Sequence, residues 1–101
     1  MAQFDVYENN NPGSKKTTPF LLDVQNDILR DLNTRVVVPL MVDIGAAKQL
    51  NPIFDINSCK VVMFTNQIAA ISINNIGKKV CSLKDERESI IGALDFLITG
   101  Y

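Results

Sequence analysis

The chain has 101 residues, of which 47% are hydrophobic and 21% are charged, so we expect one folded domain over residues 1–101 with its own core. Its ten Lys and Arg residues nearly balance eleven Asp and Glu residues, which argues against direct binding of DNA or RNA. No apolar run approaches the roughly 18 residues of a membrane span, so we expect a cytoplasmic protein that does not bind membranes.

Residues suited to catalysis or metal binding are scarce. There is no histidine, which excludes a His-dependent triad and most transition-metal sites. Cys59 and Cys81 lack metal-ligand spacing and are expected to be free, buried thiols. Asp23, Asp27 and Asp31 lie in a segment typical of a turn, where a solvated acidic rim is favoured over a cation site. We therefore expect no catalytic residue, no metal and no cofactor, and an interaction protein is favoured over an enzyme.

The first part of the chain is typical of short strands joined by polar loops. Residues 3–7 form a predicted strand, residues 8–18 ("ENNNPGSKKTT") a loop, and residues 19–24 the returning strand. The next segment, "NDILRDLNT", combines turn formers with the apolar pair Ile28 and Leu29. Such a pair is either tucked under its loop or offered to a partner.

Residues 35–42 ("RVVVPLMV") are the most strongly strand-like stretch, because β-branched side chains occupy both faces. Pro39 cannot donate a hydrogen bond to a neighbouring strand, so this strand must bend, bulge or lie at an edge there. A connecting loop is expected after it, at residues 43–51.

Two further strands, residues 53–56 and 59–65, flank Asn57 and Ser58, which suit a two-residue hairpin turn. Both faces of the second of these strands are apolar, so we expect it to be buried on two sides. Residues 68–73 form another predicted strand, and "NNIGKK" after it is expected to be a turn.

The one convincing helix is predicted at about residues 85–98. Asp85 and Glu88 can form a capping box at its start. Phe96 is expected on the side opposite the apolar face, where it would be exposed. That apolar face consists of Ile90, Ile91, Leu94, Leu97 and Ile98. The pattern as a whole predicts a mainly β protein, a bent antiparallel sheet or partly closed barrel, with one C-terminal helix.

Several stretches together resemble the CcdB toxin family. "FLLDVQNDIL" at residues 20–29 is similar to the segment that ends the family's second strand, and "TRVVVPL" at residues 34–40 is similar to its next strand. The N-terminal "QFDVY" and a C-terminal helix that ends in Gly100 plus one last residue also fit. The likeness covers essentially the whole chain without large gaps.

This resemblance implies an SH3-like bent antiparallel barrel of the CcdB and MazF kind. It implies the homodimeric toxin of a type II toxin–antitoxin module that supports plasmid maintenance. Such a toxin binds the DNA gyrase A subunit and traps the enzyme on cleaved DNA. A cognate CcdA-type antitoxin neutralises it, and the toxin meets operator DNA, and so regulates transcription, only through the antitoxin complex.

By position, the resemblance also implies which residues contact gyrase. They lie at the C-terminus, on the last helical turn and in the apolar loop pair, and are Thr99, Gly100, Tyr101, Ile98, Asp95, Ile28 and Leu29. Thr99 stands where the plasmid-borne prototype has a tryptophan, and Tyr101 supplies an aromatic ring two residues later.

Two alternatives stay open at this point. An endoribonuclease toxin on the same barrel would use Arg30 or Arg35 with Thr34 and an aspartate. An inactive copy would only bind antitoxin, and the absence of the family's Pro-Val pair, replaced here by Ile71 and Ser72, is a further departure.

Overall fold

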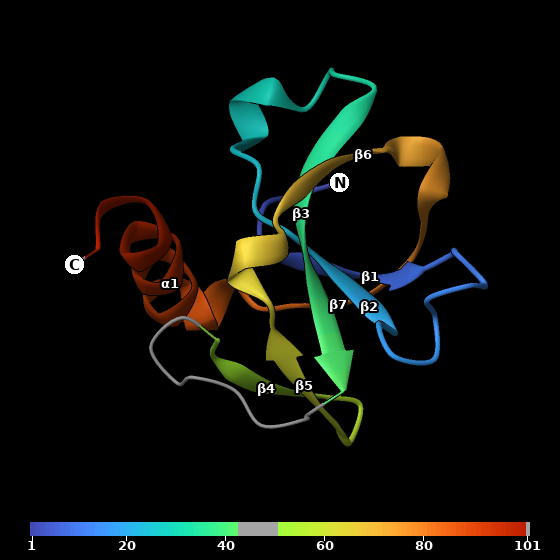
Figure 1. Cartoon of the computed structure of the whole chain (residues 1–101). Helices are drawn as coiled ribbons and strands as arrows, with labels where there is room; N and C mark the ends of the chain where they lie inside the picture. The colour runs from blue at the N-terminus through green and yellow to red at the C-terminus, as the bar shows by residue number, and fades with distance from the viewer. Residues whose placement is uncertain (43–50, 101) are drawn as a thin grey trace.

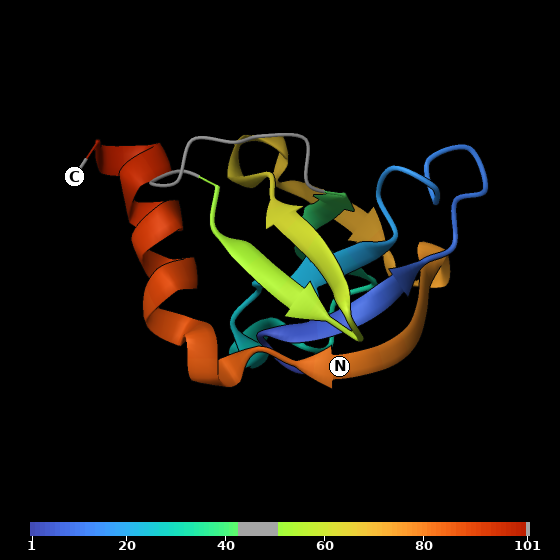
Figure 2. The same cartoon turned by 90° about the horizontal axis from the view of Figure 1, so that it is seen from below.

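A computed structural model describes residues 1–42 and 51–100, so most of the loop expected at residues 43–51 lies outside the described part. In chain order the strands and the helix are β1 (Asp5–Asn9), β2 (Phe20–Asp23), β3 (Thr34–Val42), β4 (Ile53–Ile56), β5 (Cys59–Met63), β6 (Ala69–Ser72), β7 (Ile76–Ser82) and α1 (Arg87–Thr99). The strands form a curled antiparallel sheet with α1 against one side (Figures 1 and 2). The expected fold class, a bent antiparallel barrel with one C-terminal helix, is confirmed.

Strand β3 is the centre of the sheet, whose order is β4-β5-β3-β2-β1-β7. One edge of β3 pairs with β2, and the other pairs first with β6 through residues 34–37 and then with β5 through residues 40–42. Pro39 falls where β3 exchanges one partner for the other, so its missing N–H breaks no ladder on that edge. β3 is therefore a central strand, and one of its edges lacks a paired strand only at residues 38 and 39.

The predicted hairpin between β4 and β5 is confirmed. Ile56 pairs with Cys59, which leaves Asn57 and Ser58 as a two-residue turn. Both turn residues have positive φ, 51° and 69°, as the type of turn that matches strand twist requires. Val61, Val62 and Met63 of β5 are fully buried, in line with a strand covered on both faces.

The expectation that "NNIGKK" is a turn is wrong for its last four residues. Residues 73–75 form a short 3₁₀ turn, η3 (Ile73–Asn75), but β7 begins at Ile76 and pairs with β1. Its lysines hide the strand pattern because this edge strand keeps one side in water. A Cβ at Gly77 would lie 2.9 Å from the carbonyl oxygen of Glu8, so glycine is needed where β7 approaches β1 closely.

The main core lies between one face of the sheet and α1. Ile90 and Ala93 of the helix pack with residues of β1, β2, β3, β4 and β5, among them Val6, Leu22 and Phe54. On the opposite face of the sheet, buried apolar side chains such as Tyr7 alternate with buried polar ones. Burying polar groups costs free energy unless they are hydrogen-bonded, so this second face needs an ordered polar network.

Helix α1 differs from its prediction at both ends. It is preceded by a 3₁₀ turn, η4 (Lys84–Glu86), and no side chain caps its first turn, so the Asp85–Glu88 capping box is wrong. Phe96 is half-buried and not exposed, whereas Ile98 is 80% exposed and not part of the core face. At 100° per residue Ile98 lies about 80° around the helix from the buried Ile90, which takes it past the edge of the packed face.

Candidate partner-binding surface

The segment between β2 and β3 presents apolar side chains to solvent. Its 3₁₀ turn, η1 (Asp27–Leu29), begins after Asn26, whose Oδ1 accepts a hydrogen bond from the Ile28 amide at 2.9 Å. Ile28 is 84% exposed and Leu29 48%. Leu32, which is not among the predicted contact residues, is 51% exposed three residues later. The pair Ile28 and Leu29 is therefore exposed and not tucked under its loop.

Beneath this turn lies a buried ion pair. The Arg35 Nε and Nη2 atoms lie 2.8 and 2.5 Å from Asp23 Oδ2, and both side chains are almost completely buried. Asp23 Oδ1 also accepts a hydrogen bond from the Gln25 amide at 3.0 Å. Burial raises the pKa of the Asp23 carboxyl, against the lowering effect of its hydrogen bond from Arg35. The Arg35 Nη1 atom, within the described residues, has no hydrogen-bond partner.

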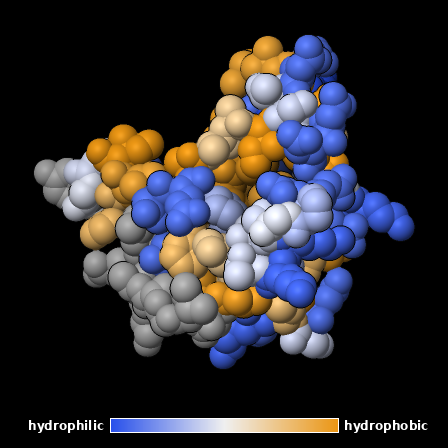
Figure 3. Space-filling view, turned by 45° about the vertical axis from the view of Figure 1, so that its right-hand side comes forward, coloured by the Kyte–Doolittle hydropathy of each residue, from blue (hydrophilic) through white to orange (hydrophobic). Residues whose placement is uncertain are grey.

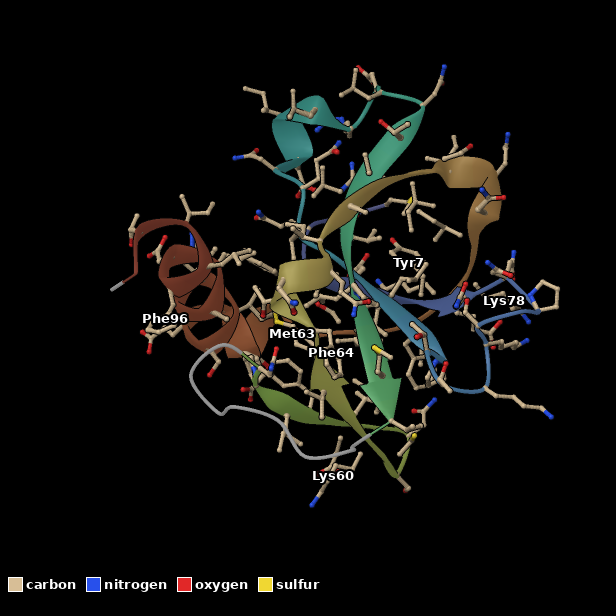
Figure 4. The ribbon with its side chains drawn as sticks, in the orientation of Figure 1. Tyr7, Lys60, Met63, Phe64, Lys78 and Phe96 are labelled. Carbon is tan, nitrogen blue, oxygen red and sulfur yellow. The ribbon has the colours of Figure 1, made fainter. Side chains whose placement is uncertain are left out.

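A second buried polar group surrounds Tyr7. Its hydroxyl donates a hydrogen bond to Asp5 Oδ2 at 3.2 Å, and Lys79 Nζ lies 3.5 Å from the same oxygen. Burial, reinforced by the negative charge of Asp5, raises the pKa of Tyr7 to about 12. Figure 4 labels Tyr7, and shows Lys60 and Lys78 on different sides of the molecule, in line with dispersed positive charge.

The C-terminal end of α1 carries another strongly exposed apolar side chain. Ile98 is 80% exposed, and Asp95 and Thr99 are exposed beside it. The Thr99 hydroxyl donates a hydrogen bond to the Asp95 carbonyl oxygen at 2.7 Å. Gly100 has φ 80° and its amide donates to the Phe96 carbonyl oxygen at 3.0 Å, so it ends the helix in the left-handed conformation that favours glycine.

The predicted contact residues form two groups and not one. Tyr101 lies outside the described residues. Figure 1 places η1 and the C-terminal end of α1 at separate corners of the molecule, and Figure 3 shows hydrophobic surface on two projections with a recess between them. A single chain therefore brings Ile28 together with Leu29, and Asp95 with Ile98 and Thr99, but does not join these two groups.

The residues weighed for RNA cleavage are not arranged as a site. Arg35 is 1% exposed and its guanidinium is engaged by Asp23, so it presents no charge to a substrate. Arg30 and Thr34 are exposed at the surface. Among residues 1–42 and 51–100, no group of three His, Cys, Asp or Glu side chains is placed to hold a metal ion.

A cleft of about 590 Å³ lies away from the predicted contact residues. Its lining combines polar and apolar surface and comprises Asn9, Asn10, Asn11, Pro12, Ser14, Thr18, Leu21, Pro39, Gln67, Ile71 and Asn75. The sequence does not predict this cleft, because residues far apart in the chain form its walls. The run of three asparagines is the one available signal in the sequence. Both cysteines are free, as expected, but they are half-buried and not fully buried.

This architecture occurs in other solved structures, among them two toxins. The Mycobacterium tuberculosis toxin MazF-mt6 matches with a TM-score of 0.75 and 12% sequence identity, over 90% of this chain and 92% of its own. An endoribonuclease in complex with its cognate antitoxin, from a mycobacterial species, matches with a TM-score of 0.70 and 16% identity, over 94% of this chain and 91% of its own. At these identities the likeness establishes the fold.

In the described residues no helix is long and apolar enough to cross a membrane. The family comparison is more specific than the structural one, because it matches the amino-acid sequence and not the fold alone. The model of the family described as CcdB protein matches residues 3–100, which include η1, the buried ion pair and all of α1. The chain therefore belongs to the CcdB family.

Proposed function

We propose that this protein is the toxin of a type II toxin–antitoxin module that acts by binding the DNA gyrase A subunit. It traps gyrase on cleaved DNA and catalyses no reaction of its own. Membership of the CcdB family supports the toxin assignment, and the fold shared with toxins of other modules agrees with it. Its setting is the cytoplasm, where gyrase works.

The observation that carries the proposal is the exposure of Ile98 at the end of α1. An isoleucine that is 80% exposed loses the free energy that burial supplies, about 1.5–3 kcal/mol. On a chain with a well-filled core, such a side chain is available to a partner. Ile28, 84% exposed, offers a second contact of the same kind.

A homodimer accounts for the separation of the two groups. A two-fold dimer presents two copies of each apolar group, and gyrase A is itself a symmetric target. Because Thr99 replaces an aromatic ring, Ile98, Gly100 and Tyr101 make most of the contact between this end of the chain and gyrase A. A CcdA-type antitoxin neutralises the toxin, and operator DNA is met only in that complex.

The experiment is a gyrase cleavage assay with purified protein. The full chain should cause protein-linked, cleaved DNA to accumulate, whereas Ile98→Glu and a chain ending at Ile98 should not, because each removes apolar contact without opening the core. The matched control is Ile73→Glu, since Ile73 is also an exposed isoleucine, 41% exposed, but lies in η3. Unaltered poisoning by the truncated chain would refute the contact assignment.

An endoribonuclease toxin is the competing assignment, and only the shared fold favours it. The buried guanidinium of Arg35 argues against it, because a catalytic cation must reach the phosphate. Incubation of the same preparations with RNA separates the two assignments. Cleavage that Arg35→Lys abolishes would replace the gyrase proposal, and growth without arrest despite tight antitoxin binding would indicate an inactive copy.

A further inference from the structure

The η1 turn is held by hydrogen bonds and not by packing. Every residue from 26 to 34 is exposed, so burial of side chains contributes little to its conformation. A free segment of this length would sample many conformations, at a cost of roughly 1–2 kcal/mol of backbone entropy for each residue that is then ordered. The fixed position of Ile28 and Leu29 therefore depends on contacts from below the turn.

Gln25 supplies the central contact. Its side chain is 5% exposed; its Nε2 donates a hydrogen bond to the Leu29 carbonyl oxygen at 2.9 Å, and its Oε1 accepts one from the Val36 amide at 3.0 Å. One amide group thus ties the turn to the central strand β3. The backbone amide of Gln25 is fixed in turn by Asp23, which Arg35 holds.

Two flanking contacts complete this arrangement. Asp27 Oδ1 accepts a hydrogen bond from the Gln3 amide at 2.8 Å, and Asn26 Oδ1 accepts one from the Ile28 amide at 2.9 Å. Within the Asp-Val-Gln-x-Asp motif, here residues 23–27, the side chains of Asp23 and Gln25 are therefore buried, whereas Asp27 is exposed and bonds to Gln3 at the surface. The next two residues, Ile28 and Leu29, face outward.

We propose that Gln25 is a positioning residue that orders the Ile28–Leu29 pair for contact with gyrase, an inference that rests on the proposed function. The gain comes from pre-organisation. If only a fraction of molecules holds the turn in the binding conformation, the apparent affinity falls by that fraction. Gln25 touches no partner itself, because it is buried behind the turn.

The test combines binding with backbone dynamics in the full-length protein. Gln25→Met keeps the length of the side chain and removes both hydrogen bonds. Its dissociation constant for a gyrase A fragment should rise about tenfold, and the order parameters of the Ile28 and Leu29 amides should fall from about 0.85 to below about 0.6. In an Ile28→Ala/Leu29→Ala background the same change should weaken binding less than about twofold, because nothing remains to be positioned.

A second pair of variants keeps the test valid if Gln25→Met fails to fold. Asn26→Ala removes the exposed cap on the Ile28 amide and should weaken binding about fivefold. Asn11→Ala is the matched control, since Asn11 Oδ1 accepts a hydrogen bond from the Gly13 amide at the same 2.9 Å in the loop between β1 and β2. It should bind like the unaltered protein.

The outcomes separate the two proposals. Suppose that Ile28→Ala/Leu29→Ala loses gyrase binding. If Gln25→Met then binds normally, or leaves the order parameters of the Ile28 and Leu29 amides unchanged, the positioning role alone is overturned. Equal losses in both backgrounds would show a general structural effect and overturn it as well. Absence of binding by the unaltered protein would refute the proposed function and the positioning role with it.

Discussion

At the scale of single residues, the most informative feature is the Asp23–Arg35 pair. Both side chains are almost fully buried on the face of the sheet opposite the main core. A buried pair of this kind stabilises little by itself, because desolvation offsets much of the attraction, but an unpaired member is costly. The pair is therefore a constraint on sequence: once Arg35 is buried, Asp23 must remain.

Removing one member of the Asp23–Arg35 pair should lower the free energy of unfolding more than removing both members. Asp23→Leu leaves an uncompensated guanidinium in the interior and should lower the free energy of unfolding by about 3–5 kcal/mol. Asp23→Leu/Arg35→Met should recover most of this loss. Urea unfolding followed by circular dichroism suits a chain without tryptophan. A double variant as unstable as the single one would contradict the argument.

Tyr7 predicts the behaviour of the protein in alkali. Its pKa is raised from 10.0 to about 12, so between these values the folded state holds a proton that the unfolded state releases. The stabilisation is complete below pH 10 and is lost as the pH rises toward 12. Between pH 9 and pH 11 the unaltered protein should lose about 1 kcal/mol more than Tyr7→Phe. Parallel losses in the two proteins would indicate that Tyr7 is not the group responsible.

At the scale of elements, α1 serves two purposes along its length. Ile90 and Ala93 anchor its first half in the core, and its last turn carries exposed residues and ends in a left-handed glycine. The element is thus rigid where it is packed and accessible where a partner is proposed. The stability of α1 also depends on its two glycines, Gly92 and Gly100, which do not belong to the hydrophobic pattern.

The two glycines of α1 should respond in opposite directions to alanine. Gly92 is in the helix interior with nothing within 4 Å of an added Cβ, so Gly92→Ala should raise the free energy of unfolding by about 0.5–1 kcal/mol. Gly100 has equal space but φ 80°, so Gly100→Ala should lower it by about 1 kcal/mol. Thermal or urea unfolding measures both. The same sign in the two variants would show that space, and not backbone conformation, decides.

At the scale of the whole molecule, the separation of the two apolar groups makes the oligomeric state decisive. A monomer presents η1 and the end of α1 at different corners, whereas a two-fold dimer can place copies of both on one surface. Exposed apolar residues on two projections also favour an assembly with another protein surface over a free monomer.

Sedimentation equilibrium at micromolar concentration should therefore give a mass of twice 11.2 kDa. A chain ending at Ile98 should give the same stoichiometry if the last three residues serve gyrase and not the dimer. A lone monomer at working concentration would contradict the proposed mode of binding. Dissociation on truncation would place the C-terminus in the dimer contact instead.

The sequence by itself determined those features that depend on neighbouring residues. The Asn57–Ser58 turn follows from residues that tolerate positive φ, β3 from its β-branched run, and α1 from its apolar period. The whole-chain resemblance determined the family. These signals are local or additive along the chain, so no knowledge of distant contacts is needed to read them.

Only the tertiary structure decided what distant segments do to one another. β7 is a strand because β1 lies beside it, and Ile98 is exposed because the packed face of α1 turns away from it. The inward Asp23, Gln25 and Arg35 could not be told from solvated residues in the sequence. Whether a polar side chain is buried depends on partners contributed by other strands, and a linear pattern does not contain them.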